Sequence, residues 1–429
     1  MDANRKTAYL TLMAVEQKKA YSNIALNHQI IVGKPTSEAF VRELVYGVLE
    51  NKIWLDYILE HLIPSGVESV KTSDLTILRM GIYQLGYMDS VPEYAAVNES
   101  VVLAKRFARG RSGFINGVLR SYIRERYNIK LPDRFEDEVK YLSIKYSYDP
   151  WIISLWMEQY DSRFVEELLE AGNQKPPMVI RMNWLKVVKR DLIARLEKQG
   201  FEVSEGKLCD DSLYIKGSGL INNQLYRNGM YSVQDEAALL VANMLDPKQG
   251  DLIMDLCAAP GGKTMAIAER MNNRGKIIAS DIYKRKLNIV EQEAKRLGIT
   301  IVETRPWDAT RVDSNMVQKA DRVLVDVPCS GLGVIRRKPE IKYKKPFNLD
   351  GLPRIQLEIL SAGAQYVKVG GVIVYSTCTI NAHENQEVVE AFLKKNPMFK
   401  KEEAVQLLPN VNGTDGFYIC KLRKDGGLL

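Results

Sequence analysis

Cysteine is scarce in this chain, and no two cysteines form a C-x-x-C pair. The five cysteines among 429 residues are odd in number and lie far apart. Closely paired cysteines are the usual signal of a zinc site or of dithiol redox chemistry. We therefore expect free thiols and no bound metal.

Long apolar runs are also missing. No stretch approaches the ~18 uninterrupted apolar residues of a membrane helix. The start, MDANRKTAYLTLMAVEQ, lacks the apolar core and cleavage site of a signal peptide, so we expect a cytoplasmic protein with no membrane contact. Hydrophobic residues still make up 46% of the chain, close to the average for globular proteins. At ~150 residues per domain, the length predicts two or three domains.

Acidic residues are nearly absent from one part of the chain. Between positions 101 and 130, eight basic residues stand against one acid, although the whole chain carries a net charge of only +7. A second cluster, at 336–345, has six basic residues and one acid. Clustered bases are typical of nucleic-acid binding, so we expect both clusters to contact nucleic-acid phosphate. The expected contacts are Lys105, Arg106, Arg109 and Arg111 in the first cluster and Arg336, Arg337 and Lys338 in the second, which also contains Lys342, Lys344 and Lys345.

The two halves of the chain have different periodicities. Up to about Arg126, apolar residues recur at spacings of three and four, as in FVRELVYGVLENKIWLDYILEHLI, which predicts a bundle of helices. From about Asp235, apolar strands alternate with helical segments, which is typical of a doubly wound, mostly parallel sheet. We expect a helical domain at 1–131, a helical linker at 132–175, a small α/β subdomain at 176–234 and a larger Rossmann-like α/β domain at 235–429.

One turn of the larger domain has the composition of a ligand site. Ala259-Pro260-Gly261-Gly262-Lys263 joins the first expected strand to a helix, where glycines let the backbone approach a ligand and the helix start offers unpaired N–H groups. Asp281 ends the next strand, 19 residues after Gly262, near the ~20-residue offset at which a carboxylate meets a ribose hydroxyl. Asp308 follows the third strand in the equivalent position. These residues predict a nucleotide-like ligand.

Two cysteines follow the fourth and fifth expected strands. The fourth ends in Asp326-Val327-Pro328-Cys329 and the fifth in Ser376-Thr377-Cys378. Because the carboxyl ends of parallel strands line the ligand crevice of an open sheet, we expect both thiols to face one pocket. His383 lies nearby, but nothing around either cysteine matches the local pattern of a cysteine-histidine hydrolase. We therefore do not expect a cysteine-histidine hydrolase.

Four segments together resemble the RNA cytosine-5 methyltransferases of the NOL/NOP/Sun group. They are DLCAAPGGKT, ASDIYKRK, DRVLVDVPCSGLGVIRRKPEIK and YSTCTINAHEN, and the resemblance spans about residues 235–422. The N-terminal segments LVYGVLENKIWLD, LRMGIYQLGYM and FINGVLRSY resemble NusB-like RNA-binding domains. The combination implies a bacterial small-subunit ribosomal RNA methyltransferase that uses S-adenosylmethionine.

The resemblance also implies a role for each residue. Cys378 would attack C6 of the target cytosine, Cys329 would assist product release, and Asp326 would contact N3 or N4 of that base. Asp281 would bind the ribose of the cofactor and Asp308 its adenine. The implied cofactor site consists of Cys257, Ala258, Ala259, Pro260, Gly261, Gly262, Lys263, Asp281, Asp308 and Asp326. Because a duplex hides C5 and C6, the target cytosine must be single-stranded or flipped out.

We therefore expect C5 methylation of a cytosine in 16S ribosomal RNA, naked or in an early particle, by a monomer whose NusB-like domain and small α/β subdomain bind RNA. Two alternatives stay open. One is the same chemistry on transfer RNA, and the other is a non-catalytic RNA-binding factor in antitermination or ribosome assembly. A DNA cytosine methyltransferase is less favoured, because that class takes its nucleophile from the Pro-Cys motif and lacks the second, Thr-Cys strand end.

Overall fold

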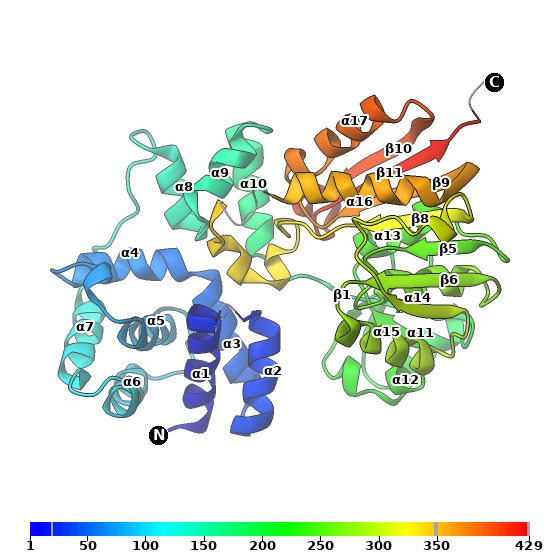
Figure 1. The fold of residues 1–429 in the computed structure, drawn as a ribbon. Coiled ribbons are helices and arrows are strands. Elements are labelled where there is room, and N and C mark those ends of the chain that lie inside the picture. The colour runs from blue at the N-terminus through cyan, green and yellow to red at the C-terminus, as the bar shows by residue number, and fades with distance from the viewer. Residues whose placement is uncertain (19, 347–350, 427–429) are drawn as a thin grey trace. The chain divides into compact units, whose positions relative to one another are not determined.

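The computed structural model of the protein describes residues 1–18, 20–346 and 351–426 (Figure 1). The chain forms two compact units. The first comprises Met1–Gln174 and Ile335–Lys345, and the second comprises Lys175–Val334 and Pro346–Leu429. Within the described ranges, no helix has both the length and the apolar character needed to cross a membrane.

The N-terminal part of the first unit is all helical, as predicted. Helix α5 lies at its centre, because nearly every side chain from Thr76 to Leu85 is buried. The apolar run that begins at Phe40 is not one helix: it breaks at Asn51, whose side-chain Nδ2 donates to the carbonyl of Gly47 at 2.8 Å and so competes with the backbone ladder. The helices are α1 (Ala3–Lys18), α2 (Ser22–Gly33), α3 (Glu38–Glu50), α4 (Lys52–Leu62), α5 (Thr72–Tyr87), α6 (Glu93–Phe107) and α7 (Ser112–Glu125).

Three further helices complete the first unit: α8 (Glu138–Tyr146), α9 (Pro150–Met157) and α10 (Ser162–Asn173). Each begins at an aspartate whose carboxylate accepts a backbone N–H of the first turn, which is the preferred N-cap arrangement. The segment 335–345, which follows the Pro-Cys motif in the chain, packs within this unit.

Lys342 anchors that segment. Its side chain is buried, and its Nζ donates to the carbonyls of Glu50 and Tyr146 and, at 2.6 Å, to Oδ1 of Asn173. Burial lowers the pKa of Lys342 to about 7. The prediction that Lys342 belongs to a phosphate-contacting cluster is wrong, because its ammonium is enclosed and its hydrogen bonds are made inside the unit.

The second unit begins with a small sheet whose strands are ordered β2-β3-β1-β4. Every neighbouring pair in it is antiparallel. Its apolar face packs with Leu192 and Leu196 of the helix that follows β1. The elements are β1 (Met178–Met182), α11 (Lys189–Glu197), β2 (Glu202–Glu205), β3 (Ser212–Lys216), α12 (Gln224–Arg227) and β4 (Tyr231–Val233).

A larger sheet, ordered β10-β11-β9-β8-β5-β6-β7, forms the rest of the unit. The strands from β9 to β7 are parallel, which confirms the predicted Rossmann-like fold. The C-terminal hairpin that adds antiparallel strands beside β9 was not predicted. The strands are β5 (Leu252–Asp255), β6 (Lys276–Asp281), β7 (Val302–Pro306), β8 (Ala320–Asp326), β9 (Val367–Thr377), β10 (Phe399–Leu407) and β11 (Phe417–Lys424).

Helices cover both faces of this sheet, and successive strand residues alternate between two cores. Ile253 packs with the helices α13 to α15, whereas Met254 packs on the opposite face with α16 and α17. The strand order reverses between β5 and β8, and ligands bind such sheets at the carboxyl ends of the strands beside the reversal. The helices are α13 (Glu236–Leu245), α14 (Gly262–Arg270), α15 (Lys284–Leu297), α16 (Leu352–Tyr366), α17 (Gln386–Lys395) and the short α18 (Pro409–Asn412).

Candidate active site

The turn between β5 and α14 requires glycine at position 261. Gly261 has a φ of 106°, in the region that side chains other than glycine rarely adopt. A Cβ at Gly261 would also lie 3.3 Å from the Cα of Val290 on α15. The turn therefore brings the backbone against its neighbours and points the first N–H groups of α14 toward the carboxyl edge of the sheet, as anion-binding helix starts do.

The carboxylates predicted to bind a nucleotide lie along the same edge. Asp281 ends β6 with its Oδ1 accepting the backbone N–H of Tyr283 at 2.9 Å. Asp308 follows β7, and hydrogen bonds from the hydroxyl and backbone N–H of Thr310 lower its pKa. Asp281 also acts on the Cys257 thiol: burial raises the pKa of Cys257, and Asp255, Asp326 and Asp281 raise it further.

Lys263 and Asp326 form an ion pair across the strand-order reversal. Lys263 Nζ lies 2.6 Å from Asp326 Oδ2, and both side chains are at least three-quarters buried. The Ser376 hydroxyl donates to the other carboxylate oxygen at 2.7 Å, because Asp326 and Ser376 are register partners on β8 and β9. Burial alone would lower the pKa of Lys263, but the Asp326 carboxylate outweighs burial and raises it.

Cys329 and Cys378 meet at the ends of these two strands. Their sulfur atoms lie 3.2 Å apart, and the backbone N–H of Cys378 points to Cys329 Sγ at 3.3 Å. The pKa of Cys329 is raised well above its usual value, first by the hydrogen bond with the Cys378 side chain and then by burial. The Lys263 ammonium is also attracted to Cys378. The two thiols therefore lie within hydrogen-bonding distance of each other, and Cys378 also faces the Lys263 ammonium.

Sequence reasoning missed the residues that hold the two cysteine loops together. Glu384 is buried, and its Oε2 accepts the backbone N–H of Ser330 at 2.8 Å and Nε2 of Gln356 at 3.0 Å. Gln356 also donates to the carbonyl of Pro328. The loop that carries Cys329 is thereby fixed to the loop that follows Cys378. In the sequence, the only sign of this role was that Glu384 is the acidic residue of the NAHEN segment.

His383 lies in that segment, and its ring contacts Glu387. Its Nδ1 lies 2.9 Å from Glu387 Oε2, and both side chains are about half exposed. A cysteine-histidine pair for hydrolysis is therefore not formed with His383.

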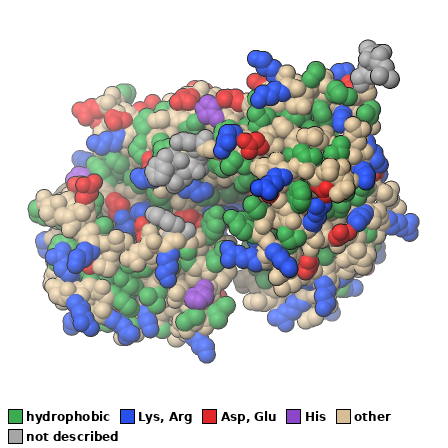
Figure 2. Space-filling model, in the orientation of Figure 1, with side chains coloured by type: hydrophobic (Ala, Val, Ile, Leu, Met, Phe, Trp, Pro, Cys, Tyr) green, Lys and Arg blue, Asp and Glu red, His purple; other side chains and the backbone are tan. Residues whose placement is uncertain are grey.

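The basic residues at the end of α6 surround a hollow of about 680 Å³ in the first unit. The helices α5 and α7 both start there without a side-chain cap, so their first N–H groups add to the positive charge. Arg111 lies over the ring of Phe114 and pairs with the buried Asp74 at 3.1 Å. Figure 2 shows Lys and Arg side chains among those on the visible face of the N-terminal helices. The basic residues that line the hollow are Lys71, Arg106, Arg109 and Arg111. Lys105, beside Arg106 on α6, is also exposed.

The second basic cluster is less accessible. Arg336, Arg337 and Lys338 are half-buried within the first unit, and Lys338 Nζ lies 5.2 Å from the ring centre of Tyr21. The first cluster is thus the better candidate for RNA contact.

Family models match three parts of the chain. A model described as 16S rRNA methyltransferase RsmB/F matches residues 242–423. The NusB family matches residues 2–124, and a ferredoxin-like domain of RsmF/B-like methyltransferases matches residues 148–222.

Relatives align along most of the chain. It is 38% identical to the probable ribosomal RNA small subunit methyltransferase B of Bacillus subtilis (strain 168), over 98% of this chain and 99% of that protein. It is 34% identical to ribosomal RNA small subunit methyltransferase B of Vibrio cholerae serotype O1, over 91% of this chain and 90% of that protein.

Two solved structures are similar to the chain. The crystal structure of PH0851 has a TM-score of 0.84 at 25% identity and covers 99% of both chains. NSun6 from Pyrococcus horikoshii, solved with SFG, has a TM-score of 0.59 at 23% identity and covers 64% of this chain and 97% of that one. The second likeness concerns the fold alone.

Proposed function

The chain belongs to the RsmB/F family of 16S rRNA methyltransferases, and on that basis we propose that it methylates C5 of a cytosine in small-subunit ribosomal RNA, with S-adenosylmethionine as the methyl donor. The observation that supports the reaction type is the pair of thiols 3.2 Å apart beside the Lys263–Asp326 ion pair. The proposed location is the cytoplasm.

The residue types match what the reaction needs. Cytosine C5 is a poor nucleophile, so the Cys378 thiolate first forms a bond to C6, and the displaced electron pair makes C5 nucleophilic. Asp326 accepts from the N4 amino group, while the Lys263 ammonium beside it stabilises the negative charge that the ring gains as the sulfur adds to C6. S-adenosylmethionine, when bound, supplies the electrophilic methyl group. The C5 proton then leaves to a base and the C6–S bond breaks, returning the electron pair to Cys378, and we assign Cys329 to this release step.

Methyl transfer to defined RNAs tests the proposal. Purified protein and S-adenosylmethionine labelled in the methyl group should label 16S ribosomal RNA, naked or in partly assembled particles, but not transfer RNA. Nuclease digestion should release the label as 5-methylcytidine. Label in another nucleoside, or only in transfer RNA, would contradict the proposed reaction or its substrate.

The residues at the strand ends fit the proposed cofactor. The backbone at Gly261 has a φ that disfavours any side chain, and Asp281 binds its own loop through Oδ1, which leaves Oδ2 for a ribose hydroxyl. We propose that Cys257 to Lys263 cradle S-adenosylmethionine, that Asp281 holds its ribose and that Asp308 contacts its adenine.

Replacing Asp281 with alanine should weaken S-adenosylmethionine binding by roughly 1.5–3 kcal/mol, the usual contribution of a hydrogen bond to a charged group. Calorimetry measures this loss directly. Glu303→Ala, which removes an exposed carboxylate from the neighbouring strand β7, is the matched control and should bind normally. Unchanged affinity in Asp281→Ala would remove Asp281 from the site.

We also propose that the hollow beside α6 docks RNA through phosphate. Changing Lys105, Arg106 and Arg109 together to alanine should lower RNA affinity and flatten its salt dependence, since each lost duplex phosphate contact removes about 0.9 from the slope. Arg111 is not changed, because its replacement would leave the buried Asp74 carboxylate without its arginine partner. Fluorescence anisotropy at several salt concentrations measures both effects.

The control for this prediction replaces Lys140 and Arg163, which are exposed on α8 and α10 of the same unit. That variant should bind RNA as the wild-type protein does. An unchanged salt slope in the triple variant would show that the basic end of α6 is a solvated surface.

A further inference from the structure

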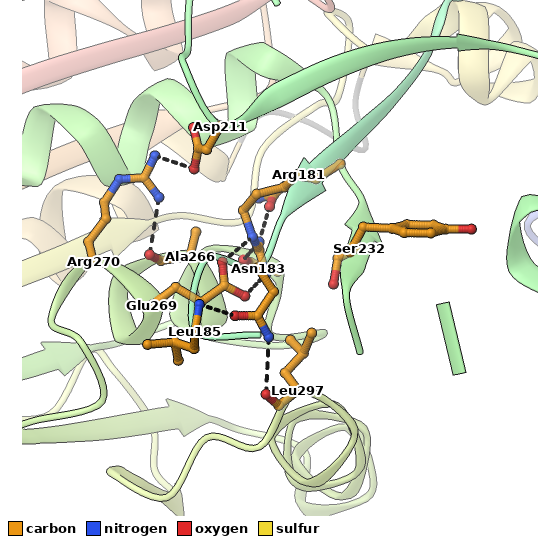
Figure 3. A network of polar contacts seen from close by, with 12 residues as sticks. Arg181, Asn183, Leu185, Asp211, Ser232, Ala266, Glu269, Arg270 and Leu297 are labelled. Carbon is orange, nitrogen blue, oxygen red and sulfur yellow. Dashed lines mark hydrogen bonds and ion pairs between the residues drawn. The ribbon is translucent and has the colours of Figure 1, made fainter. Parts of the chain in front are cut away.

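Arg181, on β1 of the small sheet, is a fully buried cation whose hydrogen bonds all reach outside its own strand (Figure 3). Its Nε and Nη2 donate to the two carboxylate oxygens of Glu269 at 2.8 and 2.9 Å. Its Nη1 donates to the carbonyl of Gly262 at 2.8 Å and also to Gln234 Oε1. One guanidinium thus joins the small sheet to α14.

The two contacts on α14 lie on one face of the helix. Gly262 is its first residue, and Glu269 lies seven positions, or about two turns, later. Gly262 belongs to the proposed cofactor turn, and the next residue is Lys263, which reaches Asp326. Arg181 therefore contacts α14 at two places. One is Gly262 in the cofactor turn at the start of the helix, and the other is Glu269, about two turns further along.

The residue two positions after Arg181 makes an equivalent contact with the next helix. Asn183 is buried, and its Nδ2 donates to the carbonyl of Leu297 at the end of α15 and to that of Gly229. Asn183 directly follows the end of β1, and Figure 3 shows both side chains directed at the helices. The end of β1 thus contacts both helices that follow the proposed cofactor-binding strand ends.

Stability alone does not explain a buried arginine at this position. Well-packed apolar residues often replace a buried ion pair without loss of stability, whereas the planar guanidinium fork fixes its partners in a defined geometry that lysine does not reproduce. The contact with the Gly262 carbonyl is the one that acts on the cofactor turn.

We propose that Arg181 is a positioning residue for the cofactor turn, through which the small sheet sets the place of Gly262 and Lys263. The inference rests on the proposed use of S-adenosylmethionine. It assigns to the small sheet a role in cofactor binding in addition to the RNA binding expected of it.

The test removes both charges of the pair, so that Glu269 is not left buried alone. Arg181→Met combined with Glu269→Leu should keep an unfolding temperature close to wild type, yet raise the S-adenosylmethionine dissociation constant and KM by at least about tenfold. The kcat at saturating cofactor should fall much less. Arg181→Lys keeps the charge but not the fork, and should also bind S-adenosylmethionine weakly.

A neighbouring buried pair provides the matched control. Arg270, the residue after Glu269, pairs with Asp211 at 2.9 Å without contacting the turn (Figure 3), so Arg270→Met with Asp211→Asn should leave cofactor affinity unchanged. Wild-type affinity in the Arg181 double variant, full rescue by Arg181→Lys, or an equal loss in the control would each overturn the proposal. Cofactor binding by the wild-type protein is measured alongside, and its absence would overturn the proposed function itself.

Discussion

Replacing Cys378 with alanine should abolish methyl transfer while leaving RNA and S-adenosylmethionine binding close to wild type. The proposed reaction cannot start without a sulfur atom to form the bond to C6. The neighbouring Cys329 thiol does not substitute for it, because burial and the Glu384 carboxylate, both retained in this variant, still raise the pKa of Cys329. Methyl-transfer assays and binding titrations on the same variant separate loss of chemistry from loss of binding.

Replacing Cys329 with alanine should instead leave the enzyme joined to its methylated product. Attack by Cys378 and transfer of the methyl group still occur, but the group that assists cleavage of the C6–S bond is missing. A denaturing gel with RNA and S-adenosylmethionine should show a slowly migrating protein–RNA adduct for Cys329→Ala.

The other cysteine variants test which cysteine attacks C6 and which one assists release. Cys378→Ala and the double variant should form no adduct, and Cys420→Ala, which removes a buried thiol of β11, should behave as wild type. An adduct with Cys378→Ala and none with Cys329→Ala would reverse the two roles and favour a mechanism with the Pro-Cys cysteine as nucleophile.

Replacing Asp326 with asparagine should lower kcat by roughly 10²–10⁴, the usual contribution of a positioned acid or base. The substitution removes the negative charge that holds the Lys263 ammonium at 2.6 Å, and it leaves one oxygen where Lys263 and Ser376 each contact their own. Because Lys263 and Asp326 act as one unit in the proposed mechanism, Lys263→Met should lower kcat similarly, and the double variant should be little worse than either.

Single-turnover rates on saturating RNA measure this loss. Asp321→Asn, which removes a carboxylate at the other end of β8, is the control and should keep near wild-type kcat. Additive losses in the Lys263 and Asp326 variants would show that the two residues act independently.

The parallel sheet and the meeting of the cysteines were predictable, because both follow from local patterns. Apolar strands alternating with helices define the sheet, and its topology alone brings Asp326, Cys329 and Cys378 to neighbouring strand ends. The C-terminal hairpin was missed because β10, FKKEEAVQL, is mostly charged and exposed. Its strand conformation depends on pairing with β11, which follows it in the chain beyond the short helix α18.

Contacts between distant segments explain the remaining differences. Lys342 looks like a surface base in the sequence, but its partners Glu50, Tyr146 and Asn173 come from other parts of the first unit. Arg181 and Glu269 lie 88 positions apart, and neither carries a local signal of their pairing. Sequence patterns report which face an element buries, and they say little about which buried charges find each other.

Bisulfite sequencing of 16S ribosomal RNA from cells with and without this protein tests the proposed function most directly. We expect one cytosine to resist conversion in cells that contain the protein, to convert fully in cells that lack it, and to become resistant again when wild-type protein is returned. Protein with Cys378→Ala should not restore resistance. An identical conversion pattern in all of these cells would contradict cytosine-5 methylation of 16S ribosomal RNA by this protein.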